Sequence, residues 1–426
     1  MTVLRETLDN GLTLLLKESR HAPVITFWVW YRVGSRNEVP GITGIAHWTE
    51  HMLFKGSEAF PKGEIDRQIA RNGGMMNGLT WLDFTTFFET LPADRIDLGL
   101  RIEADRMVNA LFDPEEVERE RTVIISERQG AENDPTFLLG EEVVAAAFRI
   151  HPYRHETIGD LCDLQRITRD ELWRHYQTYY GPNNAIVVAV GDFEATQMRA
   201  RIEELFGPIP ARANPPVVNR PEPPQRGERR VRLEGPGNTA YLQVAYRAPA
   251  AGDPDFFPMV ILSTVLTGAS GMNLFAPPPP NRTSRLYRAL VETELAASVS
   301  GALSPMLDPF LYSISATVRA GRGLEEVEAA LDREMDRVVS EPISTEELRT
   351  AIKQAKAQFA YSSESVTNQG FWLGLSSIVV NTDWFETFVD RLEAITVKDV
   401  HRAANTYLVR RNRTVGHYVP QGLQEA

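Results

Sequence analysis

The chain has 426 residues, a length that suits two or three domains, each large enough to bury a core of its own. Its formal charge of −12 argues against a nucleic-acid-binding surface, and no apolar run reaches the roughly eighteen residues that predict a membrane-spanning helix. The single cysteine, Cys162, excludes an intrachain disulfide.

The amino-terminal segment enters a strand pattern almost at once, from Leu4 to Lys17. It lacks the apolar core of a signal peptide. We therefore expect a cytoplasmic protein, or a periplasmic one if a leader peptide has been removed.

The first motif that carries chemistry is His47-Trp48-Thr49-Glu50-His51. Residues four apart in a helix lie one turn apart on one face, so both imidazoles can ligate one ion. The apolar side chains Ile45, Trp48 and Met52 recur at helical spacing, which predicts an amphipathic helix packed on a core. The order His-x-x-Glu-His is an inverted zinc-peptidase signature, and its Glu50 can reach a water on the ion. The alternative is a surface helix that carries two histidines by chance.

A strand is predicted next, from Met76 to Leu91, because this stretch is rich in Thr, Phe and Trp and follows a Gly73-Gly74 helix stop. At a sheet edge, such a strand can bind an extended peptide as an added strand. An ordinary internal strand is the alternative.

A second helix is predicted to begin at Asp113-Pro114 and to end near Arg128. Glu120 and Glu127 are seven residues apart on it and share one face. Zinc catalysis needs three protein ligands and an open position for water. This helix therefore offers candidates for the acidic ligand.

The chain between residues 208 and 236 is rich in proline and is predicted to be a semi-extended linker. The segments on either side look like distant copies, since Val29–Arg32 resembles Val244–Arg247. The helix after Asp113 also has a counterpart at Ser344, where Glu347 completes a capping box.

These repeats predict an α+β fold of two homologous α/β-roll domains, each a mostly antiparallel sheet flanked by helices. The expected domains are 1–207, which carries the zinc motif, and 237–426, which has no His-x-x-Glu-His and is expected to be non-catalytic.

Nearly the whole chain resembles the insulinase/pitrilysin family of zinc peptidases, which includes the mitochondrial processing peptidase. The segments that carry the resemblance are Leu8–Leu12, His47–His51, Met52–Ser57, Gly73–Thr80 with Asp83 and Thr85, Glu120-Arg121, Glu127, Tyr180–Asn184 and Val187–Gly191.

The resemblance assigns a role to each candidate residue. It implies that His47, His51 and Glu127 ligate Zn²⁺, that Glu50 is the catalytic base and that Glu120 is the outer carboxylate that supports the site.

The same resemblance implies that the strand containing Asn77, Gly78 and Thr80 binds substrate. Gly78 stands where alanine is usual in the family, a small change that is expected to leave the backbone role intact.

Under this assignment, zinc would lower the pKa of its water to about 7, and Glu50 would carry a proton from that water to the leaving amine. Glu120 would orient a ligand histidine. The predicted function is a zinc endopeptidase that cuts short or unfolded peptides in an enclosed chamber formed by two clam-like halves. A catalytically silent scaffold subunit is the alternative.

Members of this family also use an arginine and a tyrosine from a downstream domain. The matching stretch, Leu290–Ser298, places Val291 and Ala297 at those positions. Neither side chain can donate a hydrogen bond, so we expect a homologous partner chain to supply both groups in a heterodimer. A homodimer that uses Arg285 or Tyr287 is the alternative.

The remaining features are expected to be structural. The histidines outside the motif show no ligand spacing and are expected at the surface or at helix ends: His21, His155, His175, His401 and His417. His151-Pro152-Tyr153 is expected to form a turn. The Gly/Pro-rich stretch 271–280 is expected to line the chamber entrance or a partner contact, or to be a floppy insertion.

Overall fold

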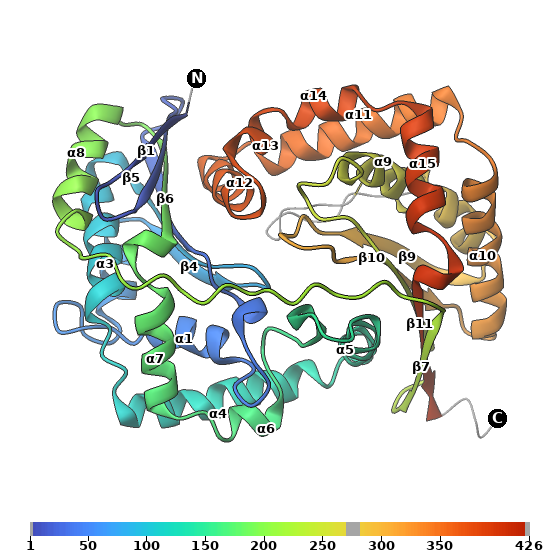
Figure 1. Ribbon diagram of the computed structural model, residues 1–426, viewed down its shortest axis with the longest axis horizontal. Coiled ribbons are helices and arrows are strands. Elements are labelled where there is room, and N and C mark those ends of the chain that lie inside the picture. Colours follow the sequence, from blue (N-terminus) through green and yellow to red (C-terminus); the bar gives the residue numbers. More distant parts are fainter. Residues whose placement is uncertain (1–2, 270–281, 422–426) are drawn as a thin grey trace. The chain divides into compact units, whose positions relative to one another are not determined.

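The computed structural model describes residues 3–269 and 282–421, which form two compact units (Figure 1). The first unit consists of Met1–Gln129, His155–Arg220 and Ser363–Thr382. The second consists of Gly130–Arg154, Pro221–Ser362 and Asp383–Ala426. Within the described ranges, no helix combines the length and the apolar character that a membrane crossing requires.

The first unit is built on a six-stranded sheet with the order β1-β2-β6-β3-β5-β4. Only β2 and β6 run parallel, and the other neighbours are antiparallel. The strands are β1 (Leu4–Thr7), β2 (Thr13–Glu18), β3 (Val24–Tyr31), β4 (Met75–Thr80), β5 (Thr85–Pro92) and β6 (Ala185–Gly191). The central strands β3 and β6 are nearly continuous apolar runs because both of their faces are buried.

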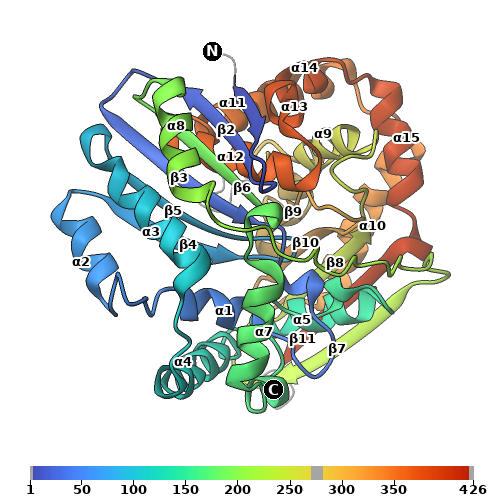
Figure 2. The same ribbon diagram turned by 60° about the vertical axis from the view of Figure 1, so that its left-hand side comes forward.

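Helices cover both faces of this sheet. They are α1 (Ile45–Leu53), α2 (Glu64–Arg71), α3 (Ile96–Asn109), α4 (Pro114–Ala131), α6 (Leu161–Leu164), α7 (Arg169–Tyr179), α8 (Ala195–Phe206) and α12 (Val366–Val379). Figure 2 shows α3 and α8 over one face. The other face receives α12, where a Cβ on Gly374 would lie 2.1 Å from the Trp30 indole nitrogen. A glycine is therefore required for this close packing.

The second unit repeats this topology with five strands in the order β7-β11-β8-β10-β9. Its strands are β7 (Arg229–Gly235), β8 (Tyr241–Arg247), β9 (Ala296–Leu303), β10 (Leu311–Val318) and β11 (Arg413–Pro420). Its helices are α5 (Pro135–Ala147), α9 (Phe256–Thr267), α10 (Leu324–Ser340), α11 (Thr345–Ser362), α13 (Thr382–Glu386), α14 (Phe388–Glu393) and α15 (Val397–Tyr407).

The two sheets correspond strand by strand, because β7-β11-β8-β10-β9 has the pairing and directions of β2-β6-β3-β5-β4. The expected α+β fold of two mostly antiparallel sheets flanked by helices is confirmed. The predicted capping box is also present, since Ser344 Oγ accepts the Glu347 N–H at 3.1 Å.

The compact units do not coincide with a contiguous division of the chain. Helix α5 packs on β11 in the second unit, and α12 packs on β3 and β6 in the first, so each unit takes one helix from beyond the linker. The division into repeats at 1–207 and 237–426 stays a prediction. The segment predicted as a linker, 208–236, is irregular only up to β7, which pairs with β11.

Two predicted strands are in fact hairpins. The stretch from Met76 to Leu91 is divided into β4 and β5 by a turn in which Trp81 N–H donates to Phe84 O at 2.8 Å. The segment from Leu4 to Lys17 is likewise divided into β1 and β2 around Gly11, whose φ is +88°. Apolar residues occur on both sides of each short turn, so the composition of the segment does not reveal the reversal of the chain.

Candidate metal centre

Helix α1 carries the His-x-x-Glu-His motif and packs against the hydrophobic core of the first unit. Ile45, Trp48 and Met52 are buried on its inner face, as their spacing predicts. Arg121 of α4 lies with its guanidinium 4.6 Å from the centre of the Trp48 ring and donates to the Leu164 carbonyl at 2.6 Å. The first contact joins α4 to α1, and the second joins α4 to the end of α6.

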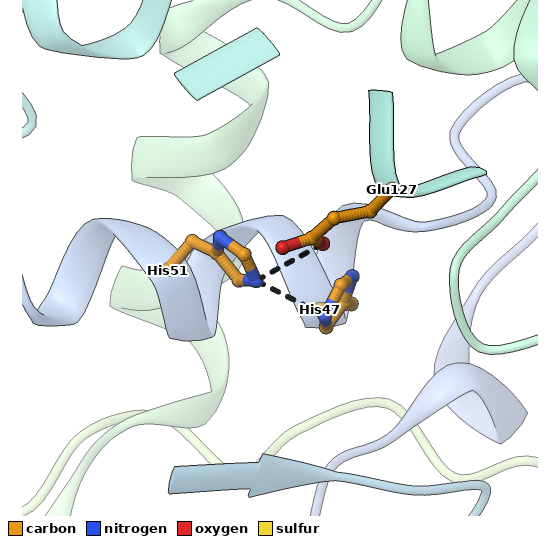
Figure 3. Close-up of side chains that lie close together, drawn as sticks. All are labelled: His47, His51 and Glu127. Carbon is orange, nitrogen blue, oxygen red and sulfur yellow. Dashed lines mark hydrogen bonds and ion pairs between the residues drawn. The ribbon is translucent and has the colours of Figure 1, made fainter. Parts of the chain in front are cut away.

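The two helices bring His47, His51 and Glu127 together (Figure 3). The Nε2 atom of His51 lies 3.1 Å from Nε2 of His47 and 3.7 Å from Oε2 of Glu127. One ligand atom from each of the three residues lies within 4.8 Å of the others. His51 is 18% exposed and Glu127 is 45% exposed, so the group is open to solvent on one side.

The donor set fits zinc. Zinc binds imidazole nitrogen and carboxylate oxygen at about 2.0–2.2 Å, so two tetrahedral ligand atoms lie about 3.3 Å apart. The separations of 3.1 and 3.7 Å bracket that value. Burial lowers the pKa of His47 to about 3, which keeps its imidazole neutral, as a metal ligand must be.

Glu120 lies on the far side of His51 from Glu127. Its Oε1 accepts the Nδ1–H of His51 at 2.9 Å. Because a carboxylate only accepts, this bond places the proton on Nδ1 and leaves the Nε2 lone pair for a ligand. The second oxygen of Glu120 pairs with Lys55. Burial by itself would raise the pKa of Glu120, but the contacts with His51 and Lys55 together lower it.

Glu50 is buried on α1 and lies against β4. Its Oε2 accepts a hydrogen bond from the Thr80 hydroxyl at 2.6 Å. Burial raises the pKa of Glu50 and Thr80 opposes this shift. A Cβ on Gly78 would lie 2.9 Å from Glu50 Oε1 and 2.9 Å from the Phe54 ring. The glycine therefore gives room to the Glu50 carboxylate and to Phe54, beyond the backbone role expected from the sequence.

The strand expected to bind substrate, β4, lies at the edge of its sheet and pairs only with β5 among the described strands. The Asn77 side chain is exposed and accepts the N–H of Gly78 at 2.9 Å. Thr80 is buried, and its hydroxyl is used by Glu50. The substrate-binding role of Asn77, Gly78 and Thr80 stays a prediction, with Thr80 limited to its backbone groups.

The second unit was expected to lack two polar groups of the family. Val291 ends the helical turn Tyr287–Val291, and Ala297 lies exposed on β9. Arg285, which the homodimer alternative would use, donates to both oxygens of Glu347 at 2.7 and 3.1 Å. The Arg285 guanidinium is therefore already bound to a carboxylate of its own unit, which counts against the homodimer alternative. The stretch 271–280 lies outside the described residues.

The expectation that the other histidines lie at the surface or at helix ends is wrong for His175 and His417, which are buried within α7 and β11. His155 directly follows the 3-10 helix Pro152–Arg154, and its side chain is 12% exposed and forms an ion pair with Glu38. Lys55 and Glu38 are the residues near the site that the sequence did not single out. Lys55 stands four residues after His51, a helical spacing that could have indicated it.

Two family descriptions match successive parts of the chain. "Insulinase (Peptidase family M16)" matches residues 13–161, and "Peptidase M16 inactive domain" matches residues 166–355. The chain belongs to the M16 peptidase family. The first description covers the His-x-x-Glu-His helix and Glu127, whereas the second covers the half without that motif.

M16 relatives match the chain over nearly its whole length. The zinc protease PqqE of Helicobacter pylori is 28% identical over 94% of this chain and 89% of its own length. The mitochondrial-processing peptidase subunit beta of Lentinula edodes is 25% identical over 94% of this chain and 86% of its own. Relatives with these names support a metallopeptidase function.

Solved M16 structures share the fold. The crystal structure of a protease from Helicobacter pylori matches with a TM-score of 0.92 at 25% identity and covers 98% of this chain and 99% of that chain. An M16 inactive domain from Pseudomonas fluorescens matches with a TM-score of 0.88 at 18% identity over 99% of this chain and 98% of that chain.

Proposed function

We propose that this M16 chain is a zinc-dependent endopeptidase that hydrolyses short or unfolded peptides. The observation that carries the proposal is the convergence of His47, His51 and Glu127 from two helices, with the Glu50 carboxylate on the same helix as both histidines. A zinc ion held by the three side chains supplies a Lewis acid and makes water acidic near neutral pH.

The chain's own residues then divide the work. Glu50 takes a proton from the attacking water and delivers it to the leaving amine nitrogen. Thr80 donates a hydrogen bond to Oε2 of Glu50 and so fixes the orientation of this carboxylate beside β4. Glu120 keeps the proton of His51 on Nδ1, which fixes the ring orientation.

Substrate selection follows from the edge position of β4. A peptide that adds to this edge is held by main-chain hydrogen bonds, so it must be extended while its side chains can vary. Folded proteins would be poor substrates because most of their backbone groups already pair within their own structure. The enclosing chamber expected from the family resemblance stays a prediction.

We further propose that a homologous partner chain completes the site by supplying an arginine and a tyrosine. Val291 and Ala297 at the matching positions support this, and so does the pairing of Arg285 with Glu347. A relative named as a subunit beta agrees with a two-chain arrangement. Full peptidase activity of the purified chain alone would refute the partner proposal and leave the zinc proposal intact.

The zinc proposal is tested with a quenched peptide library and metal analysis of the protein, alone and with its partner. Cleavage should be abolished by a chelator and restored by zinc. Glu50→Gln should keep zinc and lose turnover, His51→Ala should lose zinc, and Glu118→Gln, on an exposed face of α4, should change neither.

Two outcomes of this experiment contradict the proposal. Zinc binding without cleavage under any condition would favour the silent scaffold subunit. Retention of more than a few per cent of the activity by Glu50→Gln would remove Glu50 from the base role.

A further inference from the structure

The first turn of the zinc-motif helix α1 has no capping side chain of its own. Its N-cap residue is Gly44, with a φ of +87°. An α-helix begins with unpaired N–H groups, and a Ser, Thr, Asp or Asn at the N-cap usually accepts one of them. A Cβ on Gly44 would lie 2.5 Å from the Ile158 carbonyl oxygen, so neither the backbone angle nor the space admits such a residue.

Glu38 performs the capping from a distance. Its Oε2 accepts the N–H of Gly44 and its Oε1 accepts the N–H of Ala46, each at 2.9 Å. The carboxylate also suits the positive end of the helix dipole. The Glu38 side chain is 0% exposed, so bulk solvent does not reach its carboxylate.

A carboxylate buried this completely is stable as an anion only if a cation or further donors accompany it. His155 provides the partner, with Nε2 lying 3.0 Å from Glu38 Oε2 and 3.1 Å from the Ser35 carbonyl oxygen. Because the carbonyl accepts and never donates, Nε2 carries a proton. Burial raises the pKa of Glu38, and His155 opposes this rise.

The residues before α1 are held in the same manner by Asp163. Its Oδ2 accepts the N–H groups of Gly41 and Thr43, each at 3.0 Å, and the Thr43 hydroxyl at 2.7 Å. Two buried carboxylates thus secure the path of the chain into the helix. His47 is the third residue of α1 and stands in the turn that Glu38 caps.

We propose that Glu38 and His155 are a positioning pair for the metal centre. His155 holds the Glu38 carboxylate in place, the carboxylate fixes the first turn of α1, and this turn sets the His47 ring against His51. The inference rests on the proposed zinc function for its consequence, although the pair itself contains no metal ligand.

The experiment compares His155→Leu, His155→Gln and His175→Leu in the full chain. Leucine removes the donor to Glu38, whereas glutamine retains an N–H donor and is the rescue variant. His175 is the matched control, because it is a buried histidine of the same unit. Its ring centre lies 4.7 Å from that of Tyr179, with the two rings tilted by 45°, and burial alone lowers its pKa to about 3. The readouts are the zinc dissociation constant from chelator competition and hydrogen exchange of peptides that contain Gly44 and Ala46 in metal-free protein.

We expect His155→Leu to weaken zinc binding about tenfold, a loss typical of supporting partners of a metal site, and to speed exchange at the start of α1. His155→Gln should stay within about threefold of the wild type. His175→Leu should lower thermal stability while it leaves zinc affinity and exchange at α1 unchanged. If His155→Leu does not fold, Glu38→Gln replaces it, because its amide NH₂ would face an N–H donor.

Unchanged hydrogen exchange at Gly44 and Ala46 in a folded His155→Leu protein would refute the claim that His155 holds the Glu38 carboxylate in place. Faster exchange with unchanged zinc affinity refutes the positioning role, since the turn then loosens without consequence for the metal. If the wild type binds no zinc, the proposed function fails, whereas the exchange measurement still decides whether the pair holds the helix.

Discussion

Lys55 provides a sharp test of how the candidate metal centre is supported. Its ammonium group pairs with the oxygen of Glu120 that does not contact His51. We expect Lys55→Met to destabilise the metal-free protein, because Glu120 then keeps its negative charge inside the fold with a single partner.

The size of the effect follows from burial. Removing one partner of a fully buried ion pair costs about 3–5 kcal/mol, whereas an exposed pair contributes about 0–1 kcal/mol. Glu120 is 6% exposed and Lys55 is 24% exposed, so the pair lies between these limits. We therefore expect a loss of about 1.5–3 kcal/mol, the range for a hydrogen bond to a charged group.

The assay is urea unfolding of the metal-free protein in chelator, with Lys62→Met as the matched control. Lys62 also pairs with a glutamate of α4, Glu116, but it is 55% exposed. The control should lose less than about 1 kcal/mol. Equal losses for both variants, or a smaller loss for Lys55→Met, would refute the claim that Glu120 depends on Lys55.

Two further predictions concern single hydrogen-bonded groups. Thr80→Val keeps the side-chain shape but removes the bond to Glu50, so kcat should fall about tenfold while zinc content is unchanged; an unaltered kcat in a steady-state peptide assay would count against this positioning. In the second unit, burial by itself would raise the pKa of Glu328, but hydrogen bonds from His417 and Arg230 outweigh burial and lower this pKa to about 2. This folded pKa lies below the ordinary 4.5, so the contacts of ionised Glu328 with His417 and Arg230 stabilise the fold above about pH 4.5. This contribution is lost as the pH falls toward 2. Urea midpoints between pH 5 and 2 should therefore decline less steeply for Glu328→Gln than for the wild type, and parallel declines would contradict the linkage.

Local periodicity was sufficient to predict the zinc-motif helix, the helix that carries Glu120 and Glu127 and the repeated α+β architecture. The reason is that helical and strand patterns depend on neighbours within a few residues, as the inward-facing Ile45, Trp48 and Met52 show. The hairpin between β4 and β5 escaped prediction because the apolar residues Trp81, Leu82 and Phe84 continue through its turn.

Contacts between residues distant in the chain were decided only by the tertiary structure. His51 and Glu120 are 69 positions apart, and His155 and Glu38 are 117 apart. No local pattern connects such pairs, so the sequence did not indicate that His155 forms an ion pair with the carboxylate that accepts N–H groups at the start of α1. The exchange of α5 and α12 between the units was hidden for the same reason, since each helix packs on a sheet that it does not adjoin in sequence. The sequence by itself therefore determined which side chains are available for zinc chemistry, and the packing of distant segments decided which of them meet and what holds them there.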